Sequence, residues 1–528
     1  MQVPPTPFKI LALAPFSSSQ PTPWSKPPIR IDKTNIDQVM EGLDLSFYIS
    51  LSKDLCPAGG LNISCNKLKD FHPDTLIQNN TFLRHLLEAR KLVERVKAKR
   101  LSEEEVKTRL EQWPELPPIE IKYQSKKSEK TKENAIDDIL KLVSLPETEE
   151  APLGTHGVTA KIDAYIQQAL VHIYSHESFK KLEAVWRGVK LLVDQGGING
   201  EIRLEIVPVD FDTLDETLEN LLADPETGLP SLILIDLPMN NTPRCLEAFK
   251  KIAQFSDTLL TPAICWITHN FLQIESWEDL GKLSYLPHHM EGAAYAKWHH
   301  LKTIPQANWI AVTCNPVLAR YPYGPDNMPR SVRFEEQKLL WTSPVWAMAC
   351  LMGQSHDKTG WPTRFTQWQE IRLEGLPLVT NVRGKPCPTK ARIGEERLQQ
   401  FITAGFMPLI AGDKDSAFIP AETSIADSSF AYQVLVSRVS HFLLLCQENF
   451  KTSLAPEKLR ETLKKAFSLF WQNSGHPVPR DLEISTTKPQ AADAIVVKIT
   501  FKPSREVLPS KQKVELEFLW NNTANHDR

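Results

Sequence analysis

The sequence predicts an α/β protein with a mixed, mostly parallel sheet sandwiched by helices, together with an N-terminal α+β domain and a C-terminal β hairpin. Two runs in the middle of the chain, 232–235 and 263–267, are continuously apolar, as strands are when helices cover both faces of a sheet. Four strand-like segments alternate with helical ones, which favours parallel pairing. They lie near 202–209, 231–237, 262–268 and 308–314.

The composition is that of an ordinary globular protein. A length of 528 residues predicts about three or four domains. The formal net charge of -3 provides no global field that would attract nucleic acid or a membrane surface. No apolar stretch reaches the roughly 18 residues that a membrane span requires, so we expect a cytoplasmic protein without membrane insertion.

Neither a metal nor another cofactor is expected. The sequence contains no glycine-rich phosphate loop. None of the 8 cysteines forms a CxxC pair, and several lie in apolar runs. This pattern predicts buried, reduced thiols and no clustered metal ligands.

The pattern along the chain predicts four regions. Residues 1–122 begin with a buried strand at 8–14 and continue with half-buried strands and a long helix at roughly 73–99. Residues 123–157 start with a polar, charged linker at 123–134 and include a short amphipathic segment. Residues 158–480 form the α/β body, which includes helices near 179–193, 430–447 and 456–472. Residues 481–528 form the β tail.

The tail is predicted from alternation with a period of two. Its apolar positions are Ile495, Val497, Ile499, Phe501, Val514, Leu516 and Phe518. Because an isolated hairpin is marginally stable in water, the tail needs further strands. Either the body supplies them, or another copy of the chain does so by strand addition.

An enzymatic site is the minor alternative. Asp236, His269 and Asn315 follow predicted strands, where ligands bind in doubly wound sheets, and Asp236 or His269 could act as a general base. No nucleophile elbow or metal constellation accompanies them. Polar residues at strand ends more often close turns, so we expect no catalysis.

Several motifs resemble the large sheath subunit of type VI secretion systems, the TssC or VipB family. Residues 181–188 read KLEAVWRG, residues 295–298 read YAKW, and residues 320–326 read RYPYGPD. Further matches follow in order at 374–377, 387–389, 405–409 and 436–442. The resemblance gives structural roles to Trp186, Arg187, Gly188, Trp298, Tyr323, Gly324, Pro325 and Asp326.

The first part of the chain resembles a different protein, the small sheath subunit of the TssB or VipA family. The matching segments are 30–40, 68–74 and 83–90. The charged linker at 123–134 lies where two subunits would be joined. The chain is therefore identified as a fusion of the two subunits.

The resemblance implies a function and a set of partners. In this family, small and large subunits build a six-fold helical sheath around a tube of Hcp protein, and contraction propels the tube outward. The tail would link neighbouring copies. A baseplate and a recycling AAA+ ATPase of the ClpV type are further partners. The ATPase would recognise a helix that contains Ile136, Asp137, Ile139 and Leu140, although an ordinary linker helix is an equal alternative.

The chain also departs from the family pattern. Only seven residues precede Phe8, where the small subunit normally has a further strand. A non-contractile sheath paralogue, a baseplate adaptor or a sheath cap is therefore the second hypothesis.

Overall fold

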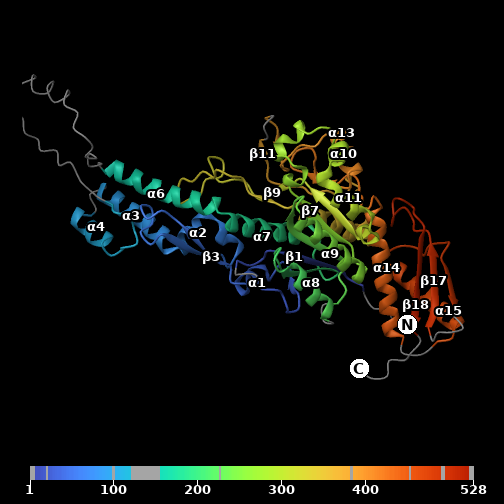
Figure 1. Cartoon of the computed structure of the whole chain (residues 1–528). Coiled ribbons are helices and arrows are strands. Elements are labelled where there is room, and N and C mark those ends of the chain that lie inside the picture. The colour runs from blue at the N-terminus through green and yellow to red at the C-terminus, as the bar shows by residue number, and fades with distance from the viewer. Residues whose placement is uncertain are drawn as a thin grey trace, which may run out of the picture. The chain divides into compact units, whose positions relative to one another are not determined.

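The apolar runs of the sequence form the strands of a seven-stranded sheet in the computed structural model (Figure 1). The structure describes residues 6–18, 22–97, 101–119, 155–224, 228–380, 384–450, 454–488 and 494–521. The sheet has the order β13-β8-β7-β6-β1-β5-β2. Its strands are β1 (Phe8–Ala14), β2 (Ile29–Ile31), β5 (Ile202–Pro208), β6 (Leu232–Met239), β7 (Ala263–Ile267), β8 (Ile310–Cys314) and β13 (Met407–Pro408).

Every neighbouring pair in this sheet is parallel except β2 with β5. The mostly parallel α/β fold is therefore confirmed. All four strands expected in the body are present as β5, β6, β7 and β8, and each end lies within two residues of its expected position.

Strand β1 lies in the middle of this sheet, between β5 and β6. Ile10 stands opposite Leu204 on one side and Leu232 on the other. The expected N-terminal domain of residues 1–122 therefore differs from the structure, because its first two strands belong to the main sheet. The local pattern of β1 shows a buried strand but carries no information about its neighbours.

Helices cover both faces of the sheet. Leu11, Ile233 and Cys265 face one core, which includes residues of α8 (Leu214–Ala223), α9 (Pro243–Leu259) and α11 (Ala296–Thr303). On the opposite face, α12 (Pro344–Thr359) packs against β6, β7 and β8. The sheet thus has the double cover that continuous apolar strands require.

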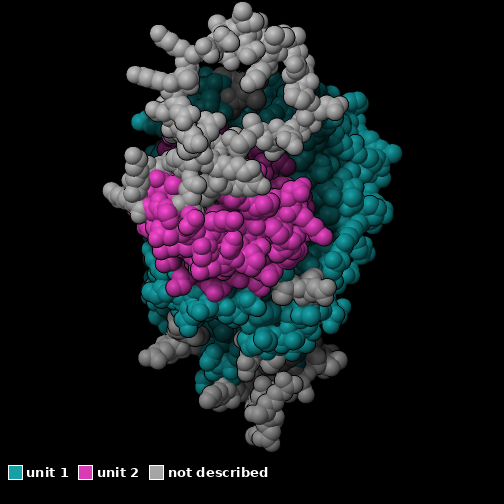
Figure 2. Space-filling view, turned by 90° about the vertical axis from the view of Figure 1, so that its left-hand side faces the viewer, with its two compact units in different colours: residues 1–45, 181–321, 339–528 teal, residues 46–180, 322–338 magenta. Residues whose placement is uncertain are grey.

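The chain divides into two compact units, drawn in different colours in Figure 2. Unit 1 contains residues 1–45, 181–321 and 339–528, and unit 2 contains residues 46–180 and 322–338. Neither unit is one continuous stretch of sequence. Helix α7 (Glu177–Gln195) begins in unit 2 and ends in unit 1.

Unit 2 contains a β hairpin and several helices. These are β3 (Ser46–Ser50), β4 (Gly60–Ser64), η1 (Leu68–Phe71), α2 (Pro73–Asn79), α3 (Thr81–Lys97), α4 (Glu103–Leu110) and α6 (Thr155–Ser175). The long helix expected at 73–99 is two helices. At Asn80 the backbone is extended, and the side-chain Oδ1 accepts a hydrogen bond of 3.1 Å from the Leu83 amide, which starts α3 as a helix N-cap does.

The C-terminal tail is part of a three-stranded antiparallel sheet with the order β16-β17-β18. The strands are β16 (Glu483–Thr487), β17 (Ala494–Phe501) and β18 (Val514–Asn521). Figure 1 shows β17 and β18 beside α14 (Phe430–Asn449) and α15 (Pro456–Asn473). The chain itself therefore supplies a third strand and packing helices, which was one of the two expected possibilities.

The remaining elements are short, apart from α13. They are α1 (Ile36–Gly42), η2 (His269–Leu272), η3 (Trp277–Lys282), α10 (Leu286–Met290), η4 (Ala293–Tyr295), η5 (Pro305–Trp309), β9 (Val317–Leu318), β10 (Trp341–Thr342), η6 (Pro362–Arg364), β11 (Val379–Thr380), β12 (Pro386–Cys387), α13 (Glu395–Thr403), β14 (Ile410–Ala411) and β15 (Ala417–Phe418). All eight cysteines are buried free thiols, as expected. Within the described ranges, no helix is long and apolar enough to span a membrane.

Candidate functional site

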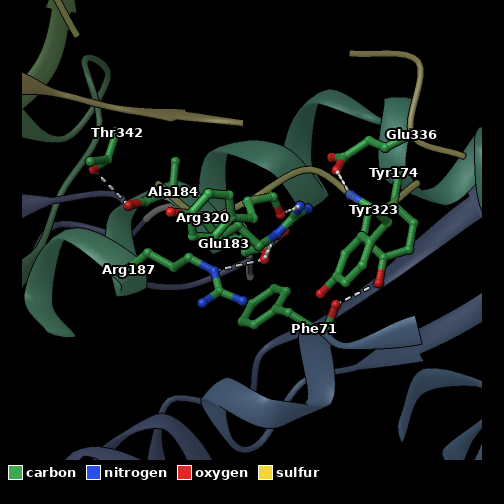
Figure 3. A network of polar contacts seen from close by, with 10 residues as sticks. Phe71, Tyr174, Glu183, Ala184, Arg187, Arg320, Tyr323, Glu336 and Thr342 are labelled. Atoms are coloured by element: carbon green, nitrogen blue, oxygen red, sulfur yellow. Dashed lines mark hydrogen bonds and ion pairs between the residues drawn. The ribbon is translucent and has the colours of Figure 1, made fainter. Parts of the chain in front are cut away.

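Glu183 forms a buried ion cluster in unit 1 with two arginines (Figure 3). Its Oε1 accepts hydrogen bonds of 2.7 Å from Arg320 Nε and 2.8 Å from Arg187 Nε, and its Oε2 accepts one of 3.1 Å from Arg320 Nη2. Glu183 and Arg187 belong to the 181–188 motif, and Arg320 opens the 320–326 motif. Two motifs separated by more than 130 residues therefore meet in one buried contact.

The arginines keep Glu183 ionised. Burial by itself raises the pKa of this carboxyl, but the charges of Arg320 and Arg187, with their hydrogen bonds, outweigh burial and lower the pKa. Arg320 binds with two nitrogens in the fork geometry that suits a carboxylate. Since Glu183 is 1% exposed, loss of Arg320 would leave its buried carboxylate with only the partly exposed Arg187 as a partner.

The rest of the 181–188 motif, which lies on α7, packs against Phe16 and α12. Trp186 is fully buried and donates from Nε1 to the Phe16 carbonyl over 3.3 Å. A Cβ added to Gly188 would lie 2.3 Å from the ring of Trp346. Only glycine therefore lets the Trp346 ring of α12 approach this turn of α7.

The 295–298 motif meets the 405–409 motif in the same way. The ring of Trp298, on α11, stacks on that of Phe406 with centroids 5.4 Å apart and an interplanar angle of 20°. Phe249 and Phe271 approach Trp298 edge-on at 5.7 and 5.1 Å. Such offset and edge-to-face pairs stabilise a core beyond simple burial.

In unit 2, the 320–326 motif continues as a tight loop. Gly324 and Asn327 exchange backbone hydrogen bonds of 3.4 and 3.0 Å, which places Pro325 and Asp326 in an exposed turn. The Tyr323 amide donates to the carboxylate of Glu336 over 3.2 Å, and its carbonyl accepts from the Glu336 amide over 2.9 Å. Figure 3 shows this pair.

Tyr174 anchors the core of unit 2. Its hydroxyl donates to the Phe71 carbonyl over 2.5 Å (Figure 3). Its ring contacts those of Tyr323 and Phe334 with centroids 5.5 and 5.0 Å apart. The hydroxyl and the ring thus tie α6 both to η1 and to the 322–338 loop within this unit.

The positions considered for catalysis are engaged in structural contacts. Asp236 lies inside β6, where the pairing with β7 shifts register between Leu234 and Pro238. Its Oδ2 accepts a hydrogen bond of 2.6 Å from Trp346 Nε1, and burial raises its pKa. Asn315, with φ 74°, donates to the carbonyls of Ala391 and Leu409.

His269 is half-buried at the start of η2, and burial lowers its pKa, as does the charge of Lys390. The described residues contain no group of three or more His, Cys, Asp or Glu side chains that could hold a metal ion.

The tail residues lie as their alternation predicts. On β17, Ile495, Val497, Ile499 and Phe501 are fully buried, and they stand opposite Trp520, Phe518, Leu516 and Val514 of β18. Trp471 of α15 contacts the Phe501 ring at 5.6 Å. Ile136, Asp137, Ile139 and Leu140 lie outside the described residues.

Sequence reasoning missed the partner of Glu183. The available signal was an acidic residue with an arginine four positions later, inside a helix whose neighbouring positions are apolar. That spacing indicates a helical Glu–Arg pair. It does not indicate Arg320, which approaches from a distant segment.

Comparison with protein families agrees with the motifs. The model described as VipB, EvpB/VC_A0108, tail sheath N-terminal domain, matches residues 156–229 and 227–426, which together exceed half of the chain. The model described as Type VI secretion system, VipA, VC_A0107 or Hcp2, matches residues 5–115.

Matches to individual proteins have low sequence identity. Type VI secretion system sheath protein TssC1 from Pseudomonas aeruginosa is 25% identical over 332 residues, which cover 55% of this chain and 66% of TssC1. The chain thus spans slightly less than two thirds of that relative.

Among solved structures, the sheath tail protein from Desulfitobacterium hafniense has 11% identity and a TM-score of 0.32, with 58% of this chain and 59% of that chain covered. The contracted sheath of the PVC extracellular contractile injection system has 11% identity and a TM-score of 0.34, with 64% and 77% covered.

The family assignment rests on the two family models and on the motifs that meet in the core. The chain belongs to the VipB family of tail sheath proteins, and it carries a VipA-type segment ahead of the VipB-type region in the same polypeptide.

Proposed function

We propose that this chain is a structural protomer of a type VI secretion contractile sheath, which polymerises around an inner tube and contracts to propel it. The observation that carries the proposal is the position of β1. This strand lies in the VipA-matching segment, and it fills the centre of a sheet whose other long strands lie in the VipB-matching region. The two parts share one hydrophobic core and act as one building block.

The partners follow from this role. The protomer would contact further copies in a six-fold helical lattice, an inner tube of the Hcp type and a baseplate, all in the bacterial cytoplasm. A ClpV-type ATPase would bind residues 136–143 on the contracted sheath. Charge reversal or deletion of this segment should abolish ATPase binding and leave assembly unchanged.

The C-terminal sheet supports assembly by strand addition. In the described structure, β18 pairs on one side only, with β17, and an edge strand of this kind can accept a strand from another chain. Leu519 on β18 is 62% exposed. Contact with a neighbouring copy would remove this apolar side chain from water.

A role without catalysis is supported by the polar residues of the sheet. Asp236 and Asn315 are buried and hydrogen-bonded to protein groups. A catalytic group needs access to a substrate proton. Turnover of a small substrate that is lost in Asp236→Ala or His269→Ala would contradict this part of the proposal.

Electron microscopy of the expressed chain tests the sheath function. Long hollow tubes are expected from the wild-type chain. Leu519→Glu is the matched variant, because it places a charge on the exposed face of β18 without altering the core, and it should shorten or abolish the tubes. Discrete particles from a folded wild-type chain would favour the adaptor or cap instead.

A further inference from the structure

Arg438, in the 436–442 motif on α14, is a buried cation without a counter-ion in the described structure. It is 7% exposed, and its Nε is buried without a hydrogen-bond partner. The described residues offer its guanidinium no ion pair and no hydrogen bond, and its one specific contact is with the ring of Trp361, at 5.3 Å from the centroid. Burial lowers the pKa of Arg438 to about 10, so the side chain remains charged at neutral pH.

An unpaired buried charge is unfavourable, because the low-dielectric interior does not replace the water that the ion loses. Buried arginines are therefore normally paired with carboxylates or phosphates. Contact with an aromatic ring offsets only part of this cost. A group from outside the described chain would complete the environment of Arg438.

Arg438 lines a cavity of about 450 Å³ in unit 1. Two other titratable groups in its wall have partners of their own. Lys9 pairs with Glu205 at 2.7 Å, and His441 contacts the Leu259 carbonyl through Nε2 over 2.8 Å. Asp224 and Glu448 also line the cavity, while Arg438 Nε has no hydrogen-bond partner.

Exposed leucines surround the same cavity. Leu222, Leu229 and Leu444 line it and are 43%, 39% and 37% exposed. Only one other leucine in the described ranges is as exposed, Leu519 on β18. Clustering of exposed apolar side chains marks a surface that a partner covers.

We propose that this cavity receives an acidic side chain from a second copy of the chain, whose carboxylate pairs with Arg438 while neighbouring apolar residues cover the three leucines. The charge of Arg438 favours an anion. The three exposed leucines around the cavity favour an anion that lies on an apolar protein surface. This inference rests on the proposed sheath function, because a polymer supplies a second copy at every position.

The test compares the full-length chain with its Arg438→Met variant. Methionine retains an apolar stem against Trp361 and removes the buried charge. The melting temperature of the unassembled variant should equal or exceed that of the wild type, because a lone buried charge has been removed. The critical concentration for tube assembly should rise about tenfold or more, as expected when one partner of a desolvated charge pair is removed.

Two further variants refine this comparison. Arg438→Lys keeps the charge but loses the two-pronged geometry, so its critical concentration should be intermediate. Arg460→Met removes an exposed arginine from α15 and serves as the control, with assembly like that of the wild type.

Four outcomes would overturn the proposal. Unchanged assembly of Arg438→Met would contradict it alone, while the sheath function stands. A lower melting temperature of the unassembled Arg438→Met chain would show that Arg438 is paired within its own chain. If sodium acetate raises the melting temperature of the wild type only, while both chains assemble equally, the occupant is a small carboxylate. A wild-type chain that forms no tubes would contradict both the sheath function and this docking site.

Discussion

Glu183 on α7 and Arg320, beyond the end of β9, form a bidentate buried ion pair although 137 residues separate them in the sequence. Arg187, one helical turn after Glu183, completes the cluster. The pair links the segment after β9 to α7, the second helix of the VipB-type region. It explains why both motifs contain charged residues at buried positions.

Breaking this pair should destabilise the fold strongly. Arg320→Ala leaves the Glu183 carboxylate buried without its main partner, which should lower the free energy of unfolding by about 3–5 kcal/mol. Urea denaturation monitored by tryptophan fluorescence measures this change. Arg187→Ala is the matched control, because the Arg187 side chain is 21% exposed and its loss should cost less. Equal effects would contradict the dominant role of Arg320.

The variant Asp236→Asn should change how stability depends on pH. Burial raises the pKa of Asp236 above its value in the unfolded chain, so the folded state binds this proton more tightly. The stability from this proton is fully present below the unfolded pKa and is lost as pH rises through the folded pKa. Asparagine has no proton to lose. The free energy of unfolding of Asp236→Asn relative to the wild type should therefore increase from acid to neutral pH. A difference that stays constant with pH would argue against a raised pKa.

Gly188→Ala should destabilise the packing of α7 against α12. The new Cβ would approach three atoms of the Trp346 ring at 2.3 to 2.5 Å, and overpacking of this kind costs about 1–3 kcal/mol. Gly42→Ala on α1 is the control, because no atom lies within 4 Å of its added Cβ. Thermal unfolding should give a lower melting temperature for Gly188→Ala only, despite the better helix propensity of alanine.

The C-terminal sheet should contribute to the stability of the unassembled chain. Phe501 is fully buried against Trp471, so Phe501→Ala should lower the free energy of unfolding by about 3–5 kcal/mol. Leu519→Ser, on the exposed face of β18, should leave it nearly unchanged. If the unassembled Phe501→Ala chain unfolds like the wild type, the packing of β17 depends on another copy.

Local patterns predicted the elements that local physics determines. The apolar runs at 232–235 and 263–267 form β6 and β7, and the helical face that includes Trp186 lies on α7. Strand β16 was missed because its sequence, EISTT, is mostly polar and only Ile484 is buried. Burial on one side of an edge strand leaves too weak an alternation to recognise.

Contacts between segments that are distant in the sequence could not be predicted in the same way. The place of β1 between β5 and β6 and the pairing of Arg320 with Glu183 depend on which distant segments meet. Neither periodicity nor capping carries that information. Motif resemblance identified Trp186, Gly188 and Trp298 as structural residues, but the reason for Gly188 became visible only through its contact with Trp346.

The central position of β1 has a consequence for biosynthesis. Phe8 pairs with Ile202 and Ile10 pairs with Leu232, so the ribosome releases β1 long before either neighbour exists. The strand FKILALA then remains exposed as an apolar segment during synthesis, which favours aggregation or chaperone binding. Joining both parts in one gene guarantees that each β1 emerges with its own acceptor at high effective concentration. Translation alone thereby fixes a one-to-one ratio, without a search for a separately made subunit.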